Sequence, residues 1–193
     1  MIFNLSELID MVIMSAYLGF IFSDMLPRHR ENYDPLKHYS KKHDWSSFKY
    51  AIYATAPAVI FHELAHKFVA MGFGLDAVFM AFYRDTFTLS LAAFSVLAKF
   101  TGFGFIFFVP GFVSISGTGT ALEFSLTAVA GPLFNLVLWL AAYFVLKSKK
   151  YSKKHFLFWT LTKKINMLLF IFNILPIPGF DGYKFLMCLL SLF

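Results

Sequence analysis

The chain has 193 residues and a net charge of +6; 59% of its residues are hydrophobic, 20% aromatic and only 15% charged. A typical soluble domain is about 25% charged, and a disordered chain needs low hydrophobicity and high charge, so this composition argues against both. The positive residues stand in short blocks between apolar runs, as in loops beside a membrane. We therefore expect an integral, multi-pass protein whose surroundings are the lipid bilayer and which binds no nucleic acid.

Several stretches have about the 20 apolar residues that a helix needs to cross a membrane. In chain order they are 6–26, 48–73, 121–147 and 156–175. Polar, basic loops follow the first stretch at 27–47 and the third at 147–154. Glu7 lies at the start of the first stretch, where the helix dipole stabilises a negative charge.

The segment 74–120, between the second and third crossings, has a different character. Its part 86–101 is apolar and helix-like but short for a crossing. The glycine-punctuated run from Gly102 to Gly119 is rich in β-branched and aromatic residues, which predicts a short hairpin or re-entrant strand. The predicted fold is therefore an all-α multi-pass membrane helical bundle with a small β-hairpin or re-entrant element between these crossings.

The second crossing contains charged residues, each of which costs about 2.5–3.5 kcal/mol in a membrane helix on insertion scales. One of them, Glu63, belongs to the HExxH sequence HELAH at 62–66. Residues four apart share one helix face, so His62 and His66 can bind one Zn²⁺ while Glu63 reaches the water bound to it. A pair of structural histidines is the alternative, but it leaves Glu63 buried without a partner.

A hydrolytic zinc site also needs a third protein ligand and one open position. The acidic residues after the motif are Asp76, Asp85, Glu123 and Asp181. Asp181 lies in the stretch NILPIPGFDG at 173–182, where prolines and glycines break the helix and can turn a carboxylate inward. The same dipeptides also fit a surface turn, so the residues alone leave its role open.

The order of these motifs resembles that of the site-2 protease family of intramembrane zinc metalloproteases. The resemblance rests on HExxH in one membrane helix, N-x-x-P-x-P-x-x-D-G near the end of a later one, and GPLFN at 131–135 between them. It implies one zinc ion per chain, held by His62, His66 and Asp181, with Glu63 as the general base.

The same resemblance implies further roles. Asn173 would hydrogen-bond the substrate backbone or the developing oxyanion, and Asn135 would aid substrate binding or helix packing. The whole chain, 1–193, would be a single membrane-embedded catalytic domain with its core at 48–182 and no soluble accessory domain. Its partner would be a transmembrane protein substrate, cleaved within its membrane segment. The oligomeric state does not follow from the sequence.

Two other functions are compatible with HExxH in a membrane helix. A CAAX-processing type of membrane metalloprotease takes its third ligand from a glutamate on a later helix, and Glu123 is the candidate here. A non-enzymatic protein, such as a metal transporter or an inactive homologue, is the other possibility. An inactive homologue would usually lack Glu63.

The ligands also constrain the topology. To bind one ion, His66 and Asp181 must lie at the same depth in the membrane. Because both lie toward the C-terminal ends of their stretches, the second and fourth crossings should run parallel. The segment 74–120 should then return to the side from which it started. The positive-inside rule places both basic loops in the cytoplasm, whereas the family pattern places them outside, so the sidedness stays open.

Overall fold

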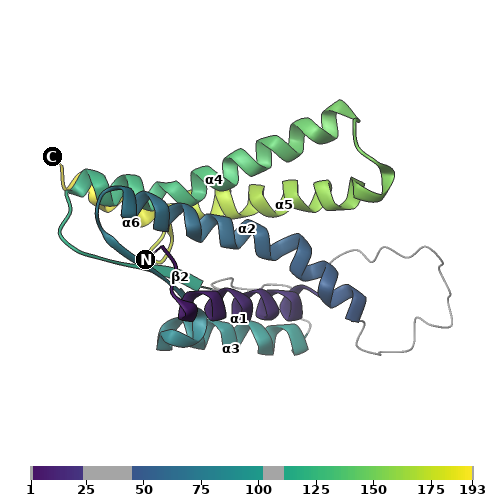
Figure 1. Ribbon diagram of the computed structural model, residues 1–193, viewed down its shortest axis with the longest axis horizontal. Coiled ribbons are helices and arrows are strands. Elements are labelled where there is room, and N and C mark those ends of the chain that lie inside the picture. Colours follow the sequence, from purple (N-terminus) through teal and green to yellow (C-terminus); the bar gives the residue numbers. More distant parts are fainter. Residues whose placement is uncertain (1, 24–44, 102–110, 193) are drawn as a thin grey trace.

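The computed structural model describes residues 2–23, 45–101 and 111–192, which are mostly helical (Figure 1). Its helices are α1 (Leu5–Phe22), α2 (Trp45–Gly72), α3 (Thr86–Thr101), α4 (Ala121–Ser148), α5 (Phe156–Ile174) and α6 (Asp181–Leu190). Short 3-10 turns, η2 (Phe82–Arg84) and η3 (Lys153–His155), precede α3 and α5. Most of the predicted loop at 27–47 and the first part of the glycine-punctuated run lie outside the described residues.

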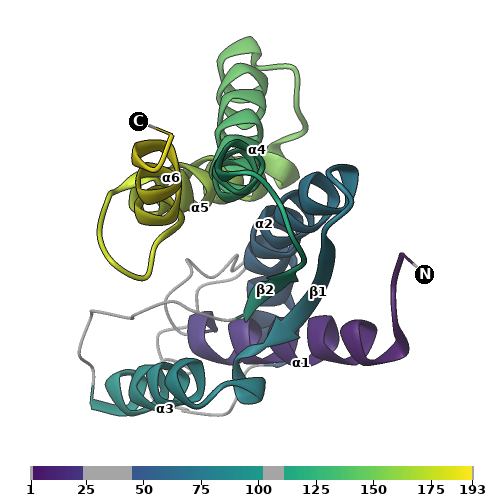
Figure 2. The ribbon, with the colours of Figure 1, turned by 90° about the vertical axis from the view of Figure 1, so that its left-hand side faces the viewer.

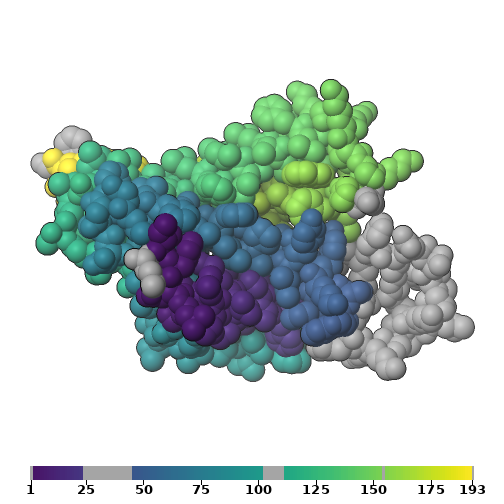
Figure 3. Space-filling model, in the orientation of Figure 1, coloured from purple at the N-terminus to yellow at the C-terminus, as the bar shows by residue number. Residues whose placement is uncertain are grey.

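Helix α2, which carries HExxH, lies in the middle of the molecule. Seen end on, it separates α4, α5 and α6 from α1 and α3 (Figure 2). Small residues make this close packing possible: Ala56 and Val59 of α2 are buried against Met14 and Leu18 of α1 and Phe79 of the sheet. In the space-filling view α1 fills the surface between α2 and α3 (Figure 3). The motif helix is therefore held by protein on two sides.

The directions of the long helices agree with the prediction from the ligands. Helices α2 and α5 run the same way, and α4 runs the opposite way (Figure 1). The last turn of α2 and the first turn of α4 lie at the same end of the molecule. The segment between them therefore returns to the side from which it started.

That returning segment contains a two-stranded antiparallel sheet, β1 (Asp76–Ala81) paired with β2 (Gly111–Ser116). The pairing runs from Asp76 opposite Ser116 to Ala81 opposite Gly111. Strand β2 and helix α3 lie where the sequence predicts a strand and a short helix, but the partner of β2 is β1, before α3, so the sheet is not a hairpin within the glycine-punctuated run. Strand β1 was not predicted, because its six residues, DAVFMA, are too short a run to be distinguished from a helix by their pattern.

Helix α1 is tied to its neighbours by two buried carboxylates. Glu7 accepts hydrogen bonds from the ammonium group of Lys67 on α2 and, at 2.7 Å, from the backbone N–H of Phe79 on β1. Asp10 accepts from Nε of Arg84 at 2.8 Å. Glu7 and Asp10 are only 2% and 1% exposed. In addition to the predicted interaction with the helix dipole, Glu7 therefore links α1 to α2 and to β1.

Within the described ranges, three helices are long and apolar enough to cross a membrane: α1, α4 and α5. Helix α2 has 28 residues but does not reach the same hydropathy. The reason is that it contains the polar residues His62, Glu63, His66 and Lys67. The apolar helices support a membrane protein, while a membrane crossing by α2 stays a prediction.

Candidate metal centre

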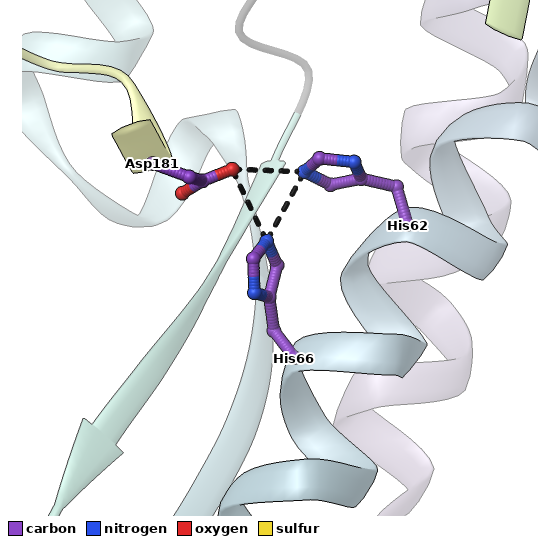
Figure 4. Close-up of side chains that lie close together, drawn as sticks. All are labelled: His62, His66 and Asp181. Atoms are coloured by element: carbon purple, nitrogen blue, oxygen red, sulfur yellow. Dashed lines mark hydrogen bonds and ion pairs between the residues drawn. The ribbon is translucent and has the colours of Figure 1, made fainter. Parts of the chain in front are cut away.

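The three predicted ligands meet at one point in the structure. Nε2 of His62 lies 3.1 Å from Nε2 of His66, and Oδ2 of Asp181 lies 3.1 Å from the first nitrogen and 3.2 Å from the second. Figure 4 shows the two rings reaching from α2 toward the carboxylate, which comes from the start of α6. Both histidines are buried, and the Asp181 side chain is 13% exposed.

The spacing of these three atoms fits a zinc ion. Ligand bonds of about 2.0–2.2 Å in a tetrahedral site put neighbouring ligand atoms about 3.4 Å apart. The observed separations of 3.1–3.2 Å differ from that by only a few tenths of an ångström. Two imidazoles and one carboxylate are also the donor set of many hydrolytic zinc sites, which keep a fourth position open.

Asp181 reaches the histidines because the chain breaks sharply between α5 and α6. Helix α5 ends at Ile174, before two prolines, and Gly179 has a φ of +101° that favours glycine. Asp181 is then the first residue of α6. A Cβ at Gly182 would lie 2.2 Å from the carbonyl oxygen of Ile174, so glycine there lets α6 start against the end of α5. Asp181 thus begins a new helix, which the sequence analysis did not predict, and it does not lie in a surface turn.

Helix α4 packs against both rings. A Cβ at Gly131 would lie 2.3 Å from Nε2 of His66 and 2.7 Å from Nε2 of His62, so only glycine leaves room for both. One turn earlier, the carbonyl oxygen of Thr127 accepts a hydrogen bond from Nδ1 of His66 at 2.7 Å. One turn later, the amide of Asn135 lies 2.9 Å from Nδ1 of His62. Because these positions are four residues apart, they share one face of α4.

A cavity of about 390 Å³ opens beside the three ligands. Glu63 and Asn173 line it, as do the ligands themselves. Strand β2 forms one wall with Phe112, Val113 and Ile115. Helix α6 adds Lys184, whose Nζ lies 3.6 Å from Oδ1 of Asp181. The cavity is large enough for a few residues of an extended peptide beside the ligands.

The structure thus places Glu63 and Asn173 where a substrate could contact them. Asn135 lies elsewhere: it is fully buried and is not among the described residues that line the cavity. Sequence reasoning did not find Thr127, because a backbone carbonyl leaves no signal of its own. Its position four residues before Gly131 was the available hint.

Comparisons with known proteins agree with this site. The chain is 33% identical over 190 residues to "Putative zinc metalloprotease MJ0611" of Methanocaldococcus jannaschii, covering 95% of this chain and 85% of that protein. It is 29% identical over 153 residues to "Putative zinc metalloprotease YwhC" of Bacillus subtilis, covering 72% of this chain and 68% of that protein. No family model and no solved structure matches the chain.

Proposed function

The chain belongs to the zinc metalloprotease family of these relatives, and we propose that it is an intramembrane protease of the site-2 type. Its substrates would be transmembrane segments of other membrane proteins, cleaved at one zinc site per chain. The observation that carries the proposal is the meeting of His62, His66 and Asp181 between helices whose outer surfaces are apolar.

The apolar surroundings of the site favour a substrate that lies within the membrane. Helix α4 supplies Gly131 and Asn135 on its inner face, while large apolar side chains stand exposed at helical spacing on its outer face. These exposed residues are Leu133, Val137, Leu140 and Phe144. A stripe of this kind is suited to lipid tails and would be a liability in water.

Zinc, when bound by the two histidines and Asp181, would polarise the peptide carbonyl and lower the pKa of water. Glu63 lines the same cavity and would accept the proton of the attacking water. It would later return that proton to the leaving amine. Asn173, which also lines the cavity, would donate a side-chain N–H to the substrate backbone or to the oxyanion that develops in the transition state.

Strand β2 would hold the substrate in an extended form. A peptide carbonyl in a helix is hydrogen-bonded and shielded, so a transmembrane substrate must unwind before hydrolysis. Unwinding exposes backbone groups, and an added strand beside a sheet edge can satisfy them. Strand β2 pairs with β1 along one edge and lines the cavity with Phe112 and Val113.

A site of the CAAX-processing type has less support. It would need Glu123 as a ligand, but the carboxylate of Glu123 accepts a hydrogen bond from the backbone N–H of Thr120 at 2.7 Å in the N-terminal cap of α4. Glu123 is not part of the cluster formed by His62, His66 and Asp181.

The test is Glu63→Gln in purified protein reconstituted with a transmembrane substrate. The variant keeps the size of the side chain but not its basicity, so we expect it to retain zinc and lose cleavage by at least 100-fold. Glu123→Gln is the matched control and should cleave at the wild-type rate. Cleavage by Glu63→Gln at the wild-type rate would end the proposal. Zinc uptake into vesicles by a wild-type protein that cleaves nothing would favour a transporter.

A further inference from the structure

Helix α4 contacts both histidines at the ring nitrogens that point away from the cluster. Nδ1 of His66 lies 2.7 Å from the carbonyl oxygen of Thr127. Nδ1 of His62 lies 2.9 Å from the side-chain amide of Asn135. The first contact uses backbone and the second uses a side chain, so the two rings are held by different means.

These contacts matter because a neutral imidazole carries one proton, and only the nitrogen without that proton can bind a metal. The carbonyl of Thr127 can only accept a hydrogen bond, so Nδ1 of His66 donates and its Nε2 keeps a free lone pair. The partner of His62 is ambiguous, because an amide can donate through nitrogen or accept through oxygen. The tautomer of His62 therefore depends on which atom Asn135 presents.

The nitrogen and the oxygen of the Asn135 side-chain amide have different neighbours. Nδ2 is the atom nearer to His62, while Oδ1 is buried with no hydrogen-bond partner in the described part of the chain. If Nδ2 donates to Nδ1, the ring proton must lie on Nε2, where it blocks a metal. If Oδ1 faces the ring, Nδ1 of His62 donates to it and Nε2 is free. A half-turn of the amide group exchanges the two atoms without moving α4.

We propose that Asn135 is a positioning residue of the metal centre, which fixes the metal-binding tautomer of His62 by accepting a hydrogen bond from Nδ1 through Oδ1. Metal-binding histidines commonly donate their second N–H to such an acceptor, which also fixes the orientation of the ring. The inference rests on the proposed function, because it concerns the same zinc site.

The burial of Asn135 favours this role over direct substrate binding. Its side chain is 0% exposed, and it lies behind the His62 ring, outside the cavity where Glu63 and Asn173 are found. A substrate in that cavity would therefore reach the Nε2 side of the His62 ring before it could reach Asn135. Asn135 therefore acts on the reaction through His62.

The test is the affinity for Zn²⁺, measured in detergent by competition with a chromogenic chelator. Asn135→Leu keeps the approximate size but removes the acceptor, and we expect its affinity to fall 10–100-fold. Asn135→Asp keeps an acceptor oxygen, so it should bind zinc at least as tightly as the wild type. The matched control is Asn166→Leu on α5, since Asn166 is also buried, also has an unpartnered Oδ1 within the described residues, and donates its amide N–H to the carbonyl oxygen of Thr162 instead of facing His62.

Wild-type affinity in a folded Asn135→Leu would overturn the inference while leaving the proposed function intact. Failure of the wild-type protein to bind zinc would overturn both. Nitrogen NMR of the histidine side chains in the zinc-free wild type gives a second readout that does not depend on how the variants fold. A proton on Nδ1 of His62 before zinc is added supports the inference, and a proton on Nε2 contradicts it.

Discussion

Replacing Gly131 by alanine tests how closely α4 must approach the two histidines. The added Cβ would lie 2.3 Å from Nε2 of His66, about 1.1 Å inside the 3.4 Å at which ordinary van der Waals contact begins. The rings cannot simply swing aside, because Thr127 and Asn135 hold their far nitrogens. Either α4 or the two ring nitrogens must therefore move by about 1 Å.

Two effects of this substitution oppose one another. Alanine is a better helix former than glycine by about 0.5–1 kcal/mol, whereas an extra carbon in a packed interior usually destabilises by about 1–3 kcal/mol. We expect a small net loss of folding stability. The effect on the site should be larger, because metal ligands tolerate deviations of only about 0.2 Å and a misplacement of about 1 Å can slow a reaction about 100-fold.

Gly131→Ala should therefore weaken zinc binding at least tenfold and slow substrate cleavage about 100-fold, while circular dichroism stays that of a folded helical protein. The matched control is Gly72→Ala at the end of α2, where a Cβ would meet nothing within 4 Å. If Gly131→Ala bound zinc and cleaved substrate as the wild type does, the site would not require the close packing of α4 against the two histidine rings, and this reasoning would be refuted.

Other parts of the fold give further predictions. Lys67→Met leaves the carboxylate of Glu7 buried without its cation, so thermal unfolding in detergent should show a loss of about 3–5 kcal/mol. Adding Glu7→Gln, which can still accept from the N–H of Phe79, should recover much of that loss; no recovery would mean that the charge pair is not the cause. A hydrogen bond to Asp10 raises the pKa of the Tyr83 hydroxyl. Since the unfolded tyrosine titrates near about 10, this stabilisation should be complete below that pH and disappear as the pH rises through the higher folded-state pKa. Unfolding measured across this range should show a shallower decline for Tyr83→Phe, and identical pH curves would refute the assignment.

The sequence was sufficient to predict the features that depend on local pattern. The long apolar stretches gave the helices to within a few residues, and the glycine-punctuated run gave strand β2. The i, i+4 spacing of His62 and His66 predicted that both rings share one face of α2. The structure brings Asp181 to those rings as the motif resemblance implied, although the residues around Asp181 also fitted a surface turn.

The features that depend on contacts between distant segments could not be predicted in the same way. Glu7 and Lys67 are separated by 60 positions, and neither shows in the sequence that the other will be its partner. Strand β1 pairs with β2, on the other side of α3 in the sequence, and a short apolar run alone does not distinguish a strand from a helix. The role of Gly131 depends on its distance from two side chains of another helix, which no pattern along α4 reveals.

The central claim is that two imidazoles from α2 and one carboxylate from α6 hold a single catalytic zinc ion. Metal analysis and X-ray absorption of the purified wild type beside Asp181→Ala test it most directly. We predict one zinc per wild-type chain, bound to two nitrogens and to oxygen at about 2.0–2.2 Å, and loss of most of that zinc in the variant. A wild-type protein without zinc, or a variant that keeps the same zinc with the same ligand shell, would contradict the account.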